Sequence, residues 1–426
     1  MRVEDCDILI IGGGPAGLIA AREAARAGRD LSIILLERDD AVGTPVRCGE
    51  GVGSAGLSEF VSPLAPLGSE SKRIKSSLGG TCDDLIRLDS DPNGQATSYQ
   101  PWISRRITHV IFRSPNGSTV RVAEGDVGYI LDRSRFEPAI AEQAVATGAE
   151  IRTRVEATAM RREHDSWRVA LRSEAGEQEI RTRIVIGADG VEGAVGRWAG
   201  IDTRVRARDM ESCAQYVVDD ADIDADAIVL HFGDRVAPGG YAWVFPKGPR
   251  SANVGLGVLG LRAEQRSAVA WLNDYVGTHF PNATRSHRTV GGVIAAATVS
   301  RTFADGLMLC GDAAHMINPL SGGGIVNAMK AGRLAAETAL DALAVNDTSA
   351  ARLESYHTRW MRLLGDDHIR FYQLKEALGR FDDAFFDRLA ATVNRIPEPR
   401  RTLRRIFGEA LIRHPSLLPV VFKYFV

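Results

Sequence analysis

Glycines and one acidic residue near the N-terminus have the spacing of a dinucleotide-binding motif. Gly12, Gly14 and Gly17 form a G-x-G-x-x-G, and Glu37 follows twenty positions after the last glycine. In this motif the first glycine makes a tight turn, the second lets a pyrophosphate approach the backbone, and the third lets a helix pack closely on a strand. The acidic residue accepts hydrogen bonds from ribose hydroxyls. These residues predict a bound dinucleotide and leave open whether it is NAD or FAD.

The elements around the motif are those that would position it. An apolar run at 8–11 predicts a buried strand that leads into the glycines, and the alanine-rich segment after them predicts a helix that ends near Gly28. A second apolar run at 31–36 predicts the strand that carries Glu37. The helix would present free N–H groups and the positive end of its dipole to phosphates. A glycine-rich turn without a ligand explains this combination poorly.

The bulk properties describe an ordinary globular protein. The chain has 426 residues, 45% of them hydrophobic and 25% charged, so we expect two or three lobes. A net charge of -2 gives no electrostatic case for nucleic acid. The five cysteines include no C-x-x-C, which argues against a metal site or a disulfide scaffold. Without a signal peptide or an apolar run of ~20 residues, we expect a cytoplasmic protein, and contact with a membrane surface stays open.

Strands that belong together are spread along the chain. The run 183–190 repeats the pattern of an apolar strand ending in glycine, and a third buried strand is expected at 307–310. We expect helices at 129–148 and 325–343, and alternating strands at 105–112 and 118–122. The predicted fold is α/β: a Rossmann-type nucleotide-binding domain assembled from discontinuous segments, an inserted, mostly antiparallel sheet, and a helical C-terminal region. The predicted boundaries are 1–75, 125–200 and 295–345 for the first, 76–124 and 201–294 for the second, and 346–426 for the third.

Two further glycine-containing motifs narrow the cofactor. They are the run 187–190, Gly-Ala-Asp-Gly, and the run 311–314, Gly-Asp-Ala-Ala, which is followed by a proline and three glycines. With the N-terminal motif, they make the chain resemble the flavoprotein superfamily built like aromatic-ring hydroxylases, which implies FAD. The resemblance implies that Asp312 binds ribityl or ribose hydroxyls, that the glycines at 322–324 open a helix against the flavin, and that Arg133 reaches the pyrophosphate. The cofactor-binding residues expected from the motifs and the resemblance are Gly12, Gly14, Pro15, Ala16, Gly17, Glu37, Arg38, Arg47, Cys48, Gly49, Arg133, Asp189, Gly190, Gly311, Asp312, Pro319, Gly322, Gly323, Gly324 and Ile325.

Two stretches resemble a narrower family within that superfamily. The loop 45–51, Pro-Val-Arg-Cys-Gly-Glu-Gly, is similar to the P-V-R-C-x-E-G loop of geranylgeranyl reductases, and 238–248 is similar to their Y-x-W-x-F-P motif. Neighbouring segments resemble the archaeal digeranylgeranylglycerophospholipid reductases, and the likeness covers roughly residues 5–345. Tyr241, Trp243 and Phe245 alternate, so on a strand they share one face. With the resemblance, we interpret this face as an aromatic wall for a long apolar chain rather than as core.

Cys48 stands in the glycine-rich loop beside Arg47, where a thiolate would be stabilised. The resemblance places this loop near the flavin. The hypothesis is that Cys48 positions or protonates an alkene, or forms a redox pair with Cys82. We expect Cys48, Tyr241 and Trp243 to be catalytic, no metal to be bound, and the substrate to be bound by Tyr216, Tyr241, Trp243, Phe245 and Gly292.

The function that the resemblance implies is an FAD-dependent reductase of isolated C=C bonds. It would saturate a geranylgeranyl chain on a lipid, a diphosphate or a quinone by hydride transfer from reduced flavin. We expect no second complete dinucleotide domain, so the electron donor is external, and NADPH, ferredoxin and a deazaflavin all stay open. The alternative is a flavin-dependent monooxygenase or related tailoring enzyme acting on a small aromatic or specialised metabolite. Against it, Lys330 stands where such hydroxylases carry an acidic residue.

The C-terminal tail carries no motif of the family. Residues on one face of an expected helix are apolar, namely Leu403, Ile406, Phe407, Ala410 and Leu411, and a cluster beside them is basic, namely Arg400, Arg401, Arg404 and Arg405. Such a helix lies on an anionic membrane or caps the substrate lobe with its basic face in water. The second interpretation is preferred.

Overall fold

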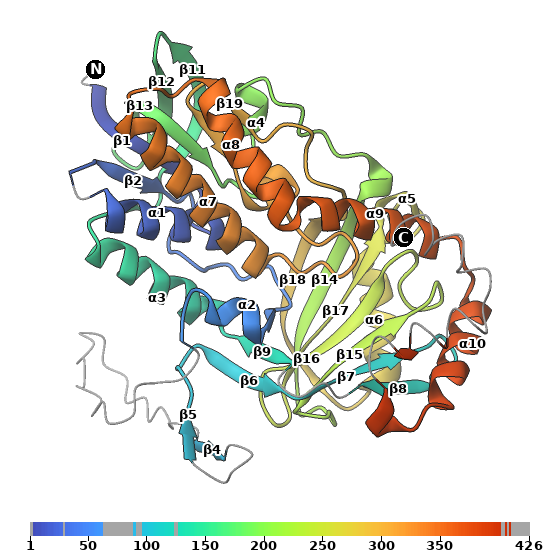
Figure 1. Cartoon of the computed structure of the whole chain (residues 1–426). Helices are drawn as coiled ribbons and strands as arrows, with labels where there is room; N and C mark the ends of the chain where they lie inside the picture. Colours follow the sequence, from blue (N-terminus) through green and yellow to red (C-terminus); the bar gives the residue numbers. More distant parts are fainter. Residues whose placement is uncertain are drawn as a thin grey trace.

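The computed structural model of the chain describes residues 3–28, 30–62, 88–90, 96–122, 127–401, 405, 406 and 409. The expectation of a mixed α/β fold is confirmed, because these residues form an eight-stranded, a seven-stranded, a three-stranded and a two-stranded sheet together with helices. Figure 1 shows the eight-stranded and seven-stranded sheets side by side, with helices around both. Cys82 and most of the apolar tail face lie outside the described residues.

The first sheet holds the N-terminal motif. Its parallel part has the order β10-β2-β1-β13-β20, formed by β10 (Glu150–Arg152), β2 (Ile33–Leu36), β1 (Val3–Ile11), β13 (Gly176–Gly187) and β20 (Leu307–Leu309). The side chains of residues 8–10 are fully buried, as expected for a strand covered on both faces. β11 (Glu156–Glu163) and β12 (Ser166–Ser173) extend the sheet as an antiparallel hairpin beside β13, and β19 (Phe303–Ala304) pairs with β20.

Helices α1 (Pro15–Ala27), α3 (Arg133–Ala146) and α7 (Ile325–Ala344) lie next to one another against this sheet, and α8 (Ala350–Trp360) packs on α7 (Figure 1). α1 and α7 approach each other closely because both are rich in alanine and glycine. A Cβ atom on Gly332 of α7 would overlap the carbonyl oxygen of Ala16. This contact holds the start of α1 close to the third turn of α7, although the two helices are about 300 positions apart in the sequence.

The seven-stranded sheet has the order β18-β14-β17-β16-β15-β7-β8. Its strands are β7 (His109–Arg113), β8 (Thr119–Val122), β14 (Met210–Asp219), β15 (Ala227–Phe232), β16 (Tyr241–Pro246), β17 (Ala252–Leu259) and β18 (Thr284–Ile294). Neighbouring strands are antiparallel except for β15 and β7, which are parallel. Helix α6 (Ala268–His279) packs against β14 and β17.

The two faces of this sheet have different residue types because side chains alternate along each strand. On β16 and β17, Ala242, Val244, Val254, Leu256 and Val258 belong to the apolar core with α6. The intervening positions carry Tyr241, Trp243 and Phe245 on β16 and Asn253, Gly255 and Gly257 on β17. A Cβ atom on Gly255 would overlap the ring of Trp243, so a glycine at this position makes room for the indole.

Two expectations about local structure are wrong. The segment 129–148 is not one helix, because it begins with strand β9 (Gly128–Leu131), whose four residues are all buried, and α3 starts only at Arg133. The alternation at 105–112 belongs to two strands, β6 (Ile103–Ile107) and β7. The chain changes sheet at Thr108, whose N–H donates to the carbonyl oxygen of Asp226. β6 and β9 join β3 (Gly51–Gly53) in the three-stranded sheet.

The remaining elements are short or C-terminal. They are α2 (Ser54–Ser58), β4 (Leu88–Ser90), β5 (Ala96–Ser98), α4 (Val195–Trp198), α5 (Gly260–Ala263), the π-helical turn Met361–Gly365, α9 (Asp366–Leu378), α10 (Asp383–Asn394) and the 3-10 turns Ala207–Asp209, Gly311–Ala314 and Glu398–Arg400. The described part of the C-terminal region is therefore helical, as expected. In the described part of the chain, no helix combines the length and the apolar character needed to cross a membrane.

Candidate active site

A cavity of about 550 Å³ lies between the glycine-rich ends of the first sheet and the aromatic side of the second. Residues 14–16, 311–312 and 322–325 line it on one side. Tyr241, Trp243 and Phe245 line it on the other, and the loop 47–53 lies between these two sides. The cavity thus brings together segments that are more than 300 positions apart in the sequence.

The N-terminal glycines adopt the geometry that the motif requires. Gly12 has a φ of 111°, and a Cβ atom there would overlap the carbonyl oxygen of Ala188. A Cβ atom on Gly17 would overlap the carbonyl oxygen of Gly12. Gly14 differs, because nothing lies within 4 Å of the position its Cβ would take. Gly12 and Gly17 are therefore required by the fold, whereas Gly14 borders open space in the cavity.

Two helix N-termini open onto this space. α1 and α7 each have a glycine N-cap, Gly14 and Gly324, with no side chain capping it and no acidic residue in the first turn. α1 begins with Pro15, which has no N–H group, so the N–H groups that follow it, together with those of the first turn of α7, are the ones that lack partners within their own helix. Both dipoles present their positive end to the cavity. Such ends favour anionic groups such as a pyrophosphate or a negatively charged ring.

Acidic side chains around the cavity fit a ligand with hydroxyl groups. Glu37 accepts hydrogen bonds from the N–H groups of Gly13 and Asp39, both at 2.8 Å. Asp189 accepts from Ala194 and Val195 through Oδ2, while its buried Oδ1 has no partner among the described residues. Burial raises the pKa of Asp189, and also that of Asp312, which Arg133 partly lowers again. The open space at Gly14, the two helix ends and the carboxylate of Asp312 in the cavity lining fit FAD, while the unpartnered oxygen of Asp189 lies behind the lining.

The predicted cofactor residues do not all reach the cavity surface. Gly14, Pro15, Ala16, Arg47, Cys48, Gly49, Arg133, Gly190, Gly311, Asp312, Gly322, Gly323, Gly324 and Ile325 line the cavity. Gly12, Gly17, Glu37, Arg38, Asp189 and Pro319 lie outside its lining. Gly12 and Gly17 shape the turn behind it, and Glu37 holds the turn in place through the N–H of Gly13.

The cation beside Cys48 is not the one that the sequence suggested. Arg47 and Arg38 both point to the exposed carboxylate of Glu192, at 3.9 and 2.8 Å. The sulfur of Cys48 instead accepts from the N–H of Glu50 at 3.2 Å and interacts with the guanidinium of Arg133. Burial lowers the pKa of Arg133, but Glu137 and Cys48 raise it by more, so the guanidinium stays charged.

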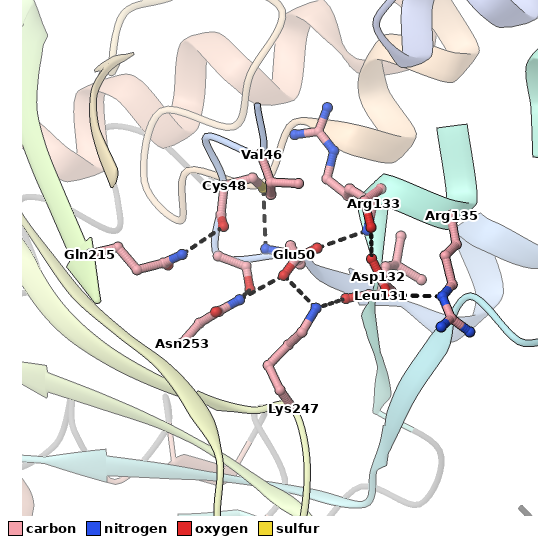
Figure 2. A network of polar contacts seen from close by, with 12 residues as sticks. Val46, Cys48, Glu50, Leu131, Asp132, Arg133, Arg135, Gln215, Lys247 and Asn253 are labelled. Carbon is pink, nitrogen blue, oxygen red and sulfur yellow. Dashed lines mark hydrogen bonds and ion pairs between the residues drawn. The ribbon is translucent and has the colours of Figure 1, made fainter. Parts of the chain in front are cut away.

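Glu50 is the centre of a buried polar network (Figure 2). It is 4% exposed and has a φ of 70°, and its Oε1 accepts from the backbone N–H of Arg133 at 2.8 Å. Its Oε2 accepts from Lys247 at 2.6 Å and from Asn253 at 2.8 Å. Lys247 also donates to the carbonyl oxygen of Leu131 at 2.7 Å. The network fixes the Cys48 loop to the start of α3 and to the second sheet.

A second link runs from the loop to the aromatic wall. Gln215 of β14 donates to the carbonyl oxygen of Cys48 at 3.1 Å and accepts from the indole N–H of Trp243 at 2.9 Å. The ring centroids of Tyr241 and Trp243 are 6.0 Å apart, and those of Trp243 and Phe245 are 6.4 Å apart. The hydroxyl of Tyr241 donates to the carbonyl oxygen of Ser321 at 2.6 Å. The wall is therefore fixed both to the Cys48 loop and to the glycine-rich loop before α7.

Tyr216 corrects one prediction for the substrate site. It is next to Gln215 on β14, so its side chain lies on the opposite face of the sheet. Its hydroxyl donates to Asn273 of α6 at 2.9 Å, and it packs with the core under that helix. Gly292, in contrast, lines the cavity. The proposed pairing of Cys48 with Cys82 involves a residue outside the described part of the chain.

Several polar residues of the site could not be assigned a role from sequence. Glu50 lies inside the Cys48 loop and Lys247 follows the aromatic strand, but they meet across 197 positions. Asn253 and Gln215 stand in segments that resemble the archaeal enzymes, and only the fold shows what they bind. Glu211, which lines the cavity from β14, belongs to no motif.

Comparison with known proteins identifies the family. Residues 7–238 match the family model of FAD dependent oxidoreductases, and residues 209–296 match that of the geranylgeranyl reductase catalytic domain. The chain belongs to the geranylgeranyl reductase family of FAD-dependent oxidoreductases. The second matched region contains strands β14 to β18, which carry the aromatic wall.

Relatives of this reductase are similar over nearly their whole length. This chain is 38% identical to the digeranylgeranylglycerophospholipid reductase of Methanosphaerula palustris, over 97% of this chain and 96% of that protein. It is 39% identical to that of Methanosarcina mazei, over 93% and 90% of the two chains.

Solved structures show the same architecture. A geranylgeranyl bacteriochlorophyll reductase-like protein from Thermoplasma acidophilum superposes with a TM-score of 0.84 at 27% identity, covering 100% of both chains. A flavin-dependent brominase reaches a TM-score of 0.67 at 17% identity, covering 95% of this chain and 94% of its own, which is a likeness of fold alone.

Proposed function

We propose that this reductase saturates the isolated double bonds of geranylgeranyl chains carried by a glycerophospholipid. The observation that carries the proposal is the cavity itself. One side consists of two open helix N-termini and the open space at Gly14, and the other is the wall of Tyr241, Trp243 and Phe245. The relatives named as digeranylgeranylglycerophospholipid reductases support the choice of substrate.

Within this proposal, the segments 1–75, 125–200 and 295–345 bind FAD, and 76–124 and 201–294 bind the prenyl chain. The described helices of the C-terminal region pack against both, α8 against α7 and α10 against β8. Bound and reduced FAD supplies a hydride. The residues of this chain bind and orient the cofactor through the helix ends, Glu37, Asp189 and Asp312.

The aromatic wall positions the alkene and excludes water. An isolated double bond is not activated by a neighbouring group, so positioning and desolvation must contribute much of the rate. Tyr241 and Trp243 are fixed by hydrogen bonds to Ser321 and Gln215, so their rings form a preorganised surface. Cys48 lines the same cavity and is held by the Glu50 network. We assign Cys48, Tyr241, Trp243, Phe245 and Gly292 to contact with the substrate.

A membrane lipid can enter only if the cavity opens toward the membrane surface. Val290 of β18 lines the cavity and is 56% exposed, so the apolar lining reaches the molecular surface there. Arg285 and Arg288 are exposed on the same edge strand but on its Tyr216 side, away from the cavity, where Arg285 lies over the Tyr216 ring and donates to Asn273 at 3.2 Å. As cations near this edge they suit anionic headgroups. Flotation with anionic liposomes tests this contact, and equal flotation of wild type and Val290→Glu would contradict it.

The experiment on activity is an anaerobic incubation with a digeranylgeranyl glycerophospholipid. The FAD-loaded protein is reduced with dithionite, or with NADPH, ferredoxin or a reduced deazaflavin to identify the donor. We expect the lipid to gain two hydrogen atoms for each reduced bond, detected by mass spectrometry. A monooxygenase of small aromatic metabolites would leave the lipid unchanged and form product only after oxygen is admitted. Full turnover by Cys48→Ser would show that Cys48 takes no part in the chemistry, and it would not contradict the proposed function.

A further inference from the structure

Glu211 is a carboxylic acid in the wall of an otherwise largely apolar cavity. It stands on β14, on the same face as Cys213 and Gln215, and all three line the cavity. In the described part of the chain, no hydrogen bond or ion pair is recorded for its carboxyl group. The side chain of Glu211 is half-buried. Removing a carboxyl group even partly from water without giving it a protein partner is costly, so it is retained only where something offsets the cost.

The neighbouring strands leave room for this side chain. A Cβ atom on Gly257 of β17 would lie 2.6 Å from Oε2 of Glu211, and one on Gly240, just before β16, would lie 3.5 Å from it. The carboxyl group therefore occupies a space that these two glycines leave free. It lies beside Tyr241, whose hydroxyl contacts the glycine-rich loop at Ser321 and Gly322. The side chain of Tyr241 thus lies between Glu211 and the loop that precedes α7.

The other ionisable groups that face this part of the cavity are poor acids. Burial raises the pKa of Tyr241 and of Cys213 far above neutrality. The Tyr241 proton is also committed to the carbonyl oxygen of Ser321. Burial raises the pKa of Glu211 to about 7, and Lys375 of α9 opposes this rise. A general acid works best when its pKa is close to the working pH, which favours Glu211 over its neighbours.

We propose that Glu211 donates the proton that completes reduction of the prenyl double bond. The inference rests on the proposed function. Reduction adds two hydrogens to the alkene: the reduced flavin supplies a hydride to one carbon, and the Glu211 carboxyl group supplies a proton to the other. The C=C π bond, the Glu211 O–H bond and the bond that holds the transferred hydride on the reduced flavin break, two C–H bonds form, the flavin is oxidised, and water returns a proton to the Glu211 carboxylate.

The charged and titratable groups around Glu211 come from three elements. They are Lys375 on α9, Tyr241 on β16 and Cys213 on β14 itself. Leu259 of β17 and Val293 of β18 pair with Glu211 across the sheet and carry no charge. Because the proton is present only on the neutral acid, the single-turnover rate must fall as the pH rises through about 7.

The test uses the full-length, FAD-loaded protein and the variant Glu211→Gln, which keeps the size of the side chain and removes the proton. The matched control is Glu264→Gln, which removes an exposed carboxylate of the same lobe outside the cavity. We expect Glu211→Gln to bind FAD and the lipid normally, and to reduce the lipid at least about 100-fold more slowly, the lower end of what general acid catalysis contributes. Wild type and the control should lose rate above about pH 7, and the residual rate of Glu211→Gln should be independent of pH.

Infrared difference spectra of the same proteins without substrate give a second readout. The wild type should show a protonated carboxyl band that disappears with a midpoint near pH 7, and Glu211→Gln should lack it. If Glu211→Gln reduces the lipid as fast as the wild type and with the same pH profile, the inference is overturned and the proposed function still stands. Absence of the infrared band from the wild type would also overturn it. A wild type that never reduces the lipid would overturn the proposed function and this inference with it.

Discussion

The two sides of the cavity are built in different ways. The side formed by the first sheet is mostly backbone: glycines and the N–H groups of two helix ends, with the carboxylates of Glu37 and Asp189 behind them accepting from backbone N–H groups. The side formed by the second sheet is mostly side chains: three aromatic rings, Gln215, and the network of Glu50, Lys247 and Asn253. Backbone features depend on local sequence, whereas side-chain networks depend on which distant segments meet. The first side suits a constant cofactor, and the second can be altered residue by residue to suit a substrate.

The largest effect is expected from breaking the buried network with Glu50→Gln. Lys247 is 20% exposed, and its partner Glu50 is 4% exposed. Removing one charge of a buried pair costs about 3–5 kcal/mol of stability because the other charge stays buried. We expect about 3 kcal/mol in urea unfolding of the FAD-loaded protein, since glutamine retains part of the hydrogen bonding.

The control for this substitution is Glu174→Gln, whose partner Arg154 and carboxylate are both exposed. It should cost at most about 1 kcal/mol. Lys247→Met, alone and combined with Glu50→Gln, completes a double-mutant cycle. Additive losses would show that the pair is not coupled and that the substrate side does not depend on this network.

The next effect is on the cofactor side, with Gly14→Ala. The φ of Gly14 is −79°, and nothing lies within 4 Å of the Cβ position, so the protein without FAD should unfold like the wild type. Overpacking by a methyl group costs about 1–3 kcal/mol, so FAD should bind about 5- to 150-fold more weakly in a fluorescence titration. Gly277→Ala of α6, whose added Cβ meets nothing closer than 3.7 Å, should leave FAD affinity unchanged. Unchanged affinity in Gly14→Ala would mean that the ligand does not approach this glycine.

A smaller effect is expected from Trp243→Phe. A smaller aromatic ring replaces the indole, and the hydrogen bond from the indole N–H to Gln215 is lost, which costs about 1 kcal/mol. We expect the KM for the lipid to rise about five-fold while FAD affinity stays the same. The matched control is Trp271→Phe, because the indole N–H of Trp271 has no partner among the described residues. A rise in KM of equal size for both variants would show that the link to the Cys48 loop does not organise the wall.

The smallest effect is expected from Tyr216→Phe. Its hydroxyl binds Asn273 on the α6 side of the sheet, away from the cavity. Lipid turnover and KM should therefore remain within about two-fold of wild type, which corresponds to a free-energy difference of at most about 0.4 kcal/mol. Tyr241→Phe, which loses the bond to Ser321, should affect turnover more. A rise in KM for Tyr216→Phe would show that Tyr216 does belong to the substrate site.

The difference between the two sides also explains what the sequence could predict. The turn at Gly12, the helix ends and the three strands around them follow from local patterns, and the expected strands at 8–11, 183–187 and 307–310 lie in one sheet. The shared face of the aromatic residues follows from strand alternation. The same alternation places Tyr216 on the face of the sheet opposite the cavity, because neighbouring residues on a strand point to opposite faces and Gln215 points toward the cavity. The pairs Glu50–Lys247 and Cys48–Arg133 join distant segments, so no local pattern predicts them.

The order in which the first sheet is threaded has a consequence for biosynthesis. β1 pairs with β13, whose residues 185–187 pair with residues 307–309 of β20, and α7 follows only after that. A nascent chain therefore exposes its first glycine motif long before the strand and the helix that complete the pocket leave the ribosome. Contacts between residues far apart in the sequence form slowly, and strand edges that are still unpaired can aggregate before those contacts form. Cofactor loading is thus a late event in the life of the polypeptide, and the cellular supply of FAD helps to decide how much of the newly made chain reaches the native state.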